Sequence, residues 1–211
     1  MIADAAFMAV LCLAALLSVI AMRHARPAAR AYLQFAAVLY LALSIAGEAA
    51  IFVPNASISL FADTVRLVVC ALGPVALSLS LFAAFEHPPK SWIAAVVLTL
   101  SCFAAIGAAI SGESALAFAP LSASVFVMLA LSLRRWRLDK RGPLHAIIAS
   151  LCFLAAAASG ASGGASTRTA LALFSAAGLL GMSLALARRL RPLVAEESGK
   201  DLRFAAIGGQ R

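Results

Sequence analysis

The sequence predicts an all-α membrane protein, a compact bundle of seven transmembrane helices, from two observations. Long apolar stretches fill almost the whole chain of 211 residues, which is 64% hydrophobic with a mean hydropathy of +1.00. A soluble domain is about half apolar, and a helix that spans a bilayer needs about 20 apolar residues. In addition, the basic residues flank these stretches on one side only.

Seven stretches are long enough to span a membrane, and all of them are nearly free of charge. They cover residues 3–22, 31–53, 62–85, 92–110, 115–133, 145–162 and 169–187. The connections between them are too short for a soluble domain, so we expect one transmembrane domain over residues 1–190 and a short polar tail over 191–211. Positive charge follows the first stretch instead of preceding it, which predicts an uncleaved helix rather than a signal peptide.

The distribution of Lys and Arg predicts the orientation. Twelve of them flank the spans on one side, against Arg66 and Arg168 on the other. The twelve are Arg23, Arg26, Arg30, Lys90, Arg134, Arg135, Arg137, Lys140, Arg141, Arg188, Arg189 and Arg191. Cytoplasmic loops carry such an excess, so the N-terminus is expected outside and the C-terminus in the cytoplasm. This bias also accounts for the net charge of +8 without nucleic acid as a partner.

Three ionisable residues within the spans are the first candidates for a functional site, because charge in lipid is costly. Glu48 lies near the outer end of the second span, and Asp63 and Arg66 lie near the outer start of the third. Glu48 and Arg66 are at similar predicted depths. Two interpretations follow: an ion pair that pins this hairpin, or a polar site that faces outward and takes a cation, a proton or an amine-bearing ligand.

Tyr40, Ser44 and Glu48 follow one another at a spacing of four residues. This spacing places all three on one face of a helix. The polar stripe favours a face that points into the bundle over one that points at lipid.

Gly73 and Pro74 lie in the middle of the third span. Proline removes a backbone donor and pushes on the preceding turn, so a kink is expected here. The kink either shapes the helix or opens a cavity. Ser78 and Ser80 follow it and could satisfy carbonyls that it frees.

Ala177, Gly181 and Ala185 recur at a spacing of four in the last span. Small residues at this spacing let two helix backbones approach closely in a membrane. They predict packing inside the bundle or, alternatively, a seam for another subunit.

The densest charged segment follows the fifth span and contains Arg134, Arg135, Trp136, Arg137, Lys140 and Arg141. Tryptophan is enriched at membrane interfaces, and basic clusters bind anionic headgroups. We interpret this segment as a loop that sets the topology and contacts lipid or a cytoplasmic partner.

The spans lack the residues of several known chemistries. They contain no lysine for a retinal Schiff base and no histidine pair for haem, and the chain has no H-E-x-x-H sequence or phosphate-binding glycine loop. The cysteines Cys12, Cys70, Cys102 and Cys152 lie singly in different spans, which predicts neither a disulfide framework nor a metal site. We therefore expect no enzyme, cofactor or metal.

The layout is similar to that of seven-helix membrane modules that precede kinase or cyclase domains in bacterial sensors. We expect a non-catalytic module of a bacterial inner membrane, either an accessory subunit of a membrane complex or a sensor that signals through a partner. The lipid bilayer, a membrane protein partner or further copies of the chain are the expected contacts. The alternative is a small transporter or channel with its polar site around Glu48, Asp63 and Arg66.

Overall fold

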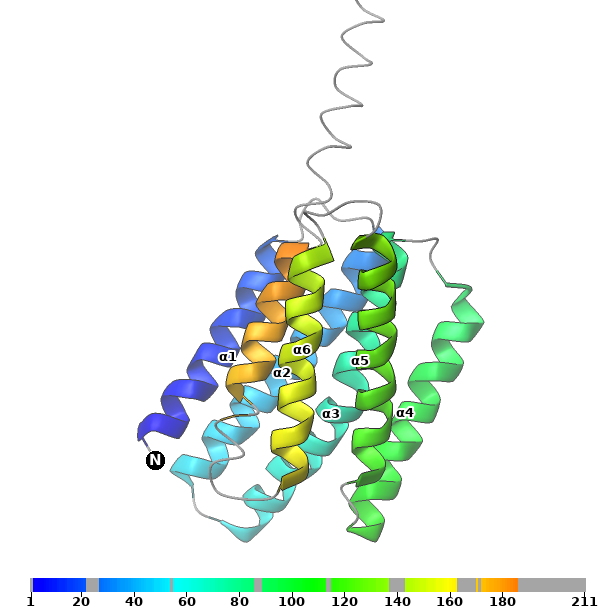
Figure 1. The fold of residues 1–211 in the computed structure, drawn as a ribbon. Coiled ribbons are helices and arrows are strands. Elements are labelled where there is room, and N and C mark those ends of the chain that lie inside the picture. Colours follow the sequence, from blue (N-terminus) through cyan, green and yellow to red (C-terminus); the bar gives the residue numbers. More distant parts are fainter. Residues whose placement is uncertain are drawn as a thin grey trace, which may run out of the picture.

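The computed structural model describes residues 2–21, 27–53, 55–85, 89–112, 115–136, 143–162, 170 and 172–185. These residues form seven helices and no strand (Figure 1). The helices are α1 (Ile2–Ala21), α2 (Pro27–Phe52), α3 (Ala56–Phe85), α4 (Ser91–Ser111), α5 (Ala115–Trp136), α6 (Pro143–Ser162) and an unlabelled helix 7 (Ala172–Ala185). Each predicted span coincides with one of them, which confirms the all-α prediction. The predicted tail lies outside the described residues.

Successive helices run in opposite directions along the bundle (Figure 1). Because their number is odd, the N-terminus lies at one end of the bundle and the last residue of helix 7 at the other. Consecutive helices from α1 to α6 are in contact, and α3 also packs against α5.

The start of α3 differs from the prediction, which places residues 54–61 in an outer loop. The helix already begins at Ala56, because Asn55 caps it: the backbone N–H of Ser57 donates to Oδ1 of Asn55 at 2.9 Å. Such a cap satisfies a donor that the first helical turn leaves free. Asp63 and Arg66 consequently lie well inside the helix rather than next to its first residue.

The predicted turn after the fourth span is confirmed at Gly112. Its φ of 74° is in the left-handed region, and its N–H donates to the carbonyl of Ala108 at 3.0 Å. Glycine adopts this conformation without the steric cost of a Cβ, so it ends α4.

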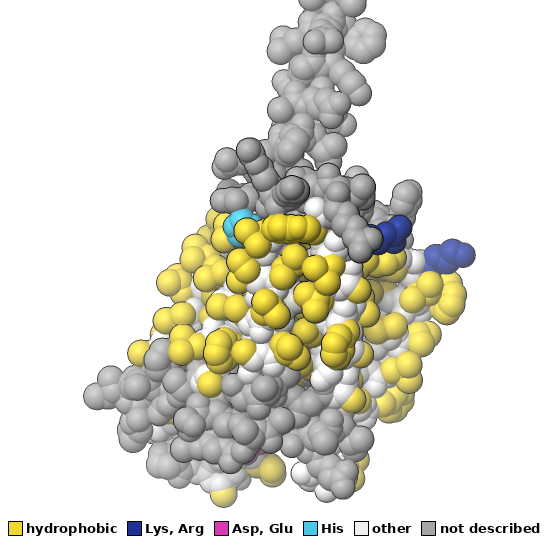
Figure 2. All heavy atoms as spheres, in the orientation of Figure 1, with side chains coloured by type: hydrophobic (Ala, Val, Ile, Leu, Met, Phe, Trp, Pro, Cys, Tyr) yellow, Lys and Arg dark blue, Asp and Glu magenta, His cyan; other side chains and the backbone are white. Residues whose placement is uncertain are grey.

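Three helices are long and apolar enough to cross a membrane: Pro27–Phe52, Ala56–Ala84 and Ser91–Ser111. Four shorter apolar stretches of the described chain are Met8–Ile20, Ala119–Arg134, Leu144–Ala156 and Ala172–Ala185. Hydrophobic side chains cover the outer surface of the bundle along most of its length (Figure 2).

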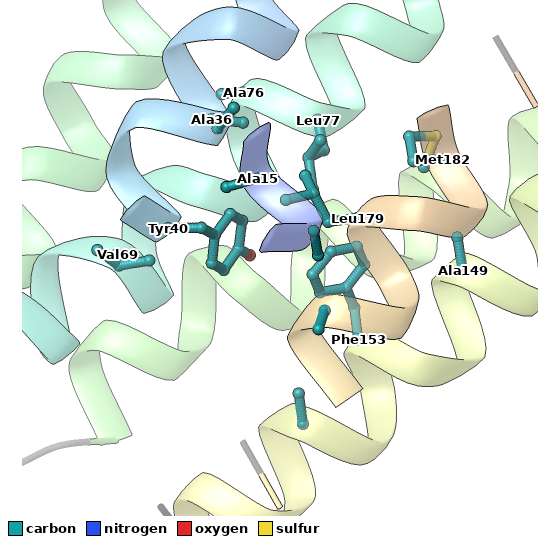
Figure 3. Close-up of a cluster of buried hydrophobic side chains, with 14 of the residues drawn as sticks. Ala15, Ala36, Tyr40, Val69, Ala76, Leu77, Ala149, Phe153, Leu179 and Met182 are labelled. Carbon is teal, nitrogen blue, oxygen red and sulfur yellow. The ribbon is translucent and has the colours of Figure 1, made fainter. Parts of the chain in front are cut away.

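The core draws side chains from α1, α2, α3, α5, α6 and helix 7. Figure 3 shows its centre, where alanines lie beside a few large side chains such as Leu77 and Phe153. The many alanines allow the helix backbones to approach closely. Helix α4 stays outside this core and packs on α3 through a separate small cluster of Val75, Leu79 and Ala94.

The small residues of helix 7 pack inside the bundle, but in a different register from the one predicted. Ala185 is buried, and a Cβ built on Gly181 would lie 3.2 Å from Cβ of Ala149 in α6. Ala177 is exposed instead, and Gly178 takes its place against α6. The prediction that residues four apart face the bundle is therefore correct for Gly181 and Ala185 only. An α-helix has 3.6 residues per turn, so a row of residues four apart gradually rotates around the helix.

Candidate functional site

The polar stripe of α2 passes from the core towards the outer end of the bundle. The exposed fractions of Tyr40 and Ser44 are 3% and 1%, whereas Glu48 is partly exposed. The prediction that this face points inward is therefore correct for the first two residues. Glu48 lies in the last two turns of α2.

Ser44 joins two helices. Its hydroxyl donates to the backbone carbonyl of Met8 in α1 at 2.6 Å. Beside it, the Met8 side chain occupies the space that a Cβ on Gly47 would need, with Cε at 2.9 Å. Ser44 thus holds α1 against α2, and its hydroxyl is engaged in packing rather than directed at a ligand.

Of the predicted cluster of Glu48, Asp63 and Arg66, the last two form an ion pair. Nη2 of Arg66 lies 3.4 Å from Oδ1 of Asp63, one turn earlier on the same helix, and their side chains are 32% and 41% exposed. In the described part of the chain, Arg66 and Glu48 form no ion pair. Residues three apart on one helix are neighbours on its surface whatever the position of the next helix. Arg66 therefore reaches Asp63 without any particular alignment of α2 and α3.

Tyr40 fits against the backbone of α3 at Gly73. A Cβ built on Gly73 would lie 2.9 Å from the Tyr40 hydroxyl oxygen and 3.0 Å from Cζ. The two helices can approach this closely only because residue 73 has no side chain. Pro74 follows inside the same unbroken helix, and its missing N–H leaves the carbonyl of Cys70 without its usual helical donor.

The serines after Pro74 do not serve the carbonyl that proline frees, contrary to the expectation from sequence. Ser78 donates to the carbonyl of Val75 at 2.8 Å. Ser80 donates across to the carbonyl of Ala29 in α2, also at 2.8 Å. Both bonds suit an apolar surrounding, where an unpaired hydroxyl is costly. Ser80 adds a second link between helices, at the opposite end of α2 from Ser44.

Phe153 of α6 completes the centre of the bundle, and sequence reasoning missed it. Its ring centroid lies 6.0 Å from that of Tyr40 with the planes at 30°. The ring also covers Gly178 of helix 7, where a built Cβ would lie only 2.6 Å from Cε2. The only sequence signal is the presence of glycine in the third and the seventh span, and this signal does not say which aromatic residue covers it.

The basic segment after the fifth span is described in part. Arg134 is exposed and Trp136 is partly buried at the end of α5, while the side chain of Arg135 and residues 137–141 lie outside the described part. The Lys and Arg side chains visible in Figure 2 lie at the end of the bundle where α3 and α5 finish. This is the end that the sequence predicts to be cytoplasmic.

Comparison of the chain with protein-family models, with curated proteins and with solved structures finds no match. The fold therefore defines a class, an all-helical protein with helices able to cross a membrane. The function has to be argued from the contacts described above.

Proposed function

We propose that this chain is a seven-span protein of a bacterial inner membrane, with its N-terminus outside and its C-terminus in the cytoplasm. Three facts support the four spans beyond the three long helices. The remaining helices alternate in direction with the long ones, they share the same core, and their outward side chains are apolar. Arg30, Lys90 and Arg134 lie near helix ends that meet at one end of the bundle, as the positive-inside rule requires of a cytoplasmic end.

A cysteine-labelling experiment tests this topology in intact spheroplasts. In a variant without native cysteines, a membrane-impermeant maleimide should label Asn55→Cys and Gly112→Cys, but should label Lys90→Cys only after lysis. Asn55 and Lys90 are both exposed next to helix ends, so they form a matched pair. Labelling of Lys90→Cys in intact cells would contradict the orientation.

Within this topology, the protein acts as a non-catalytic module, an accessory subunit or a sensor that signals through a partner protein. The observation that supports this function is the use of the polar stripe in packing. Arg66, outside the stripe, is paired with Asp63 within α3, while in the stripe Ser44 is bonded to α1 and Tyr40 is seated on Gly73 of α3. Groups engaged in this way hold helices together and do not form a row of ligand groups along a path.

One observation favours the alternative of a small transporter or channel. Glu48 is a partly exposed carboxylate inside the predicted second span, and it has no ion pair in the described part of the chain. Ionisable residues in this setting commonly mark the pathways of ions and protons. Glu48 is therefore the residue on which transport would depend.

Purification from native membranes in mild detergent, with quantitative mass spectrometry, separates the two functions. A protein partner at fixed stoichiometry, retained equally by the Glu48→Gln variant, supports the module. Proton flux in liposomes that hold the purified chain and a pH-sensitive dye, lost in Glu48→Gln, supports the transporter. A chain that is purified alone and supports such flux would overturn the proposed module.

A further inference from the structure

Two aromatic rings connect the proline-containing region of α3 with helix 7 across the centre of the bundle. The sequence of contacts is Gly73 of α3, Tyr40 of α2, Phe153 of α6 and Gly178 of helix 7. Figure 3 shows the two rings facing each other between their helices, beside Leu179 of helix 7. In the function proposed above, Tyr40 serves only as a packing contact with α3, and Phe153 has no role.

We propose that Tyr40 and Phe153 form a rigid link that couples the bend of α3 at Gly73 and Pro74 to the position of helix 7. This inference rests on the proposed sensor or subunit function, because a displacement of helix 7 matters only when a partner detects it. The link itself is a property of the single chain and can be measured without any partner.

The first step of the argument is that α3 is deformable at the first contact. Pro74 removes the hydrogen bond to the carbonyl of Cys70, and helices bend most readily where such a bond is missing. Gly73 precedes this point and carries no side chain that would resist a change of bend. The angle between the part of α3 before Gly73 and the part after it can therefore change more easily than the angle at other points of the helix.

The second step is that Tyr40 cannot yield when α3 moves towards it. Its ring fills the space beside Gly73, since a Cβ built on Gly73 would lie only 3.0 Å from its Cζ, and only 3% of the residue is exposed. Helix α2 is held on both sides of Tyr40 along the chain, by the bond that Ala29 accepts from Ser80 of α3 and by the bond from Ser44 to α1. A movement of α3 at Gly73 is consequently passed to the ring rather than absorbed by α2.

The third step carries the movement to helix 7. Phe153 is 1% exposed, contacts the Tyr40 ring on one side and covers Gly178 on the other. Protein interiors are close-packed and compress little, so a displaced ring displaces its neighbour. Gly178 lies seven residues before Ala185, about 10 Å along the helix, so a displacement at Gly178 would also move the Ala185 end of helix 7.

Distance measurements between two spin labels test the link in lipid nanodiscs. In a variant without native cysteines, the labels are placed at Leu133 of α5 and Leu184 of helix 7, both of which are about half exposed near the same end of the bundle. Gly73→Ala adds a methyl group against Tyr40 and should shift the mean label distance by roughly 1–2 Å, the size of typical helix displacements. The double variant Gly73→Ala and Phe153→Leu, which lacks the second ring, should return the distance to its original value.

Gly47→Ala is the matched control. It adds the same methyl group at a similarly close contact, with Cε of Met8 at 2.9 Å, but this contact is with a flexible methionine side chain and not with either ring. It should leave the label distance unchanged. An unchanged distance in folded Gly73→Ala, or a shift that persists without the Phe153 ring, would overturn the link.

Tyr40→Leu provides a second test that does not depend on the folding of Gly73→Ala. It removes the first ring without adding volume, so the distribution of distances between the labels at Leu133 and Leu184 should broaden. An unchanged width would count against the link. Because both tests use the isolated chain, they can fail while a stoichiometric partner is still found, and they can succeed when none is found.

Discussion

Helices α3 and α4 are both long and strongly apolar, yet they occupy different environments. In their most apolar segments, 72% of the residues of α3 are buried inside the bundle and only 22% of those of α4. Among the described residues, helix α3 packs mainly against α2, α4 and α5, and the main contacts of α4 are with α3 and α5. Hydrophobicity therefore indicates that a helix belongs in a membrane and does not indicate whether its neighbours are helices or lipid.

The difference lies in the pattern of small residues. Buried positions of α4 form one narrow stripe of Ala94, Ser101, Ala105 and Ala108, and large side chains cover the rest of its surface. Helix α3 is buried continuously from Val69 to Leu81, where glycine, alanine, serine and cysteine alternate with leucine and valine. Small residues all around a helix allow several neighbours to approach at once.

The largest test of this comparison is the truncation of one leucine in each helix. Leu77→Ala in α3 removes a fully buried side chain, which typically costs about 2–5 kcal/mol. Leu100→Ala in α4, 63% exposed, should cost far less. Unfolding in detergent with increasing SDS measures both. Equal losses would show that α4 is buried against a partner or another copy in the membrane.

Enlarging an alanine in each helix should give the next largest effect. Ala76→Leu in α3 forces a larger side chain into a contact that is fully buried, at a typical cost of about 1–3 kcal/mol. Ala109→Leu in α4 points away from the bundle and should be tolerated. The midpoint of thermal unfolding in detergent compares the two variants, and a stable Ala76→Leu protein would contradict the tight packing of α3.

A smaller effect is expected for one serine of each helix. Ser80 of α3 donates to α2, whereas Ser101 of α4 donates within its own helix, to Val97 at 2.8 Å. Hydrogen bonds between helices in a membrane contribute about 0.6 kcal/mol on average. Ser80→Ala should lower the free energy of unfolding by about this amount and Ser101→Ala by less. The reverse order would mean that the link between α2 and α3 is not important.

The smallest effect concerns the charges of α3, for which α4 has no counterpart. A double-mutant cycle on Asp63 and Arg66, with the neutral variants Asp63→Asn and Arg66→Gln, should give a coupling of about 0.3–0.5 kcal/mol, since both side chains are partly exposed and lie one turn apart on one helix. The corresponding cycle with Glu48→Gln and Arg66→Gln should give none. Coupling in the second cycle would restore the ion pair between the two helices that the sequence suggested.

The sequence by itself determined where the helices lie and at which end the basic residues gather. A backbone in lipid must satisfy its hydrogen bonds within each segment, so an apolar stretch of sufficient length is read directly as a helix. Only Asn55, a local capping residue, moved a boundary appreciably, and it did so because residues 56–61 can continue the helix outward.

The tertiary structure decided which helix is central and which polar residues meet. Arg66 pairs within its own helix and not with Glu48 of the neighbouring one. Contacts between helices supply the acceptors of Ser44 and Ser80 and place the rings of Tyr40 and Phe153 against two glycines. Residue 178 rather than 177 faces α6 for the same reason. Packing is set by the shapes of residues that are distant along the chain, and a hydropathy pattern contains no information about which of them touch.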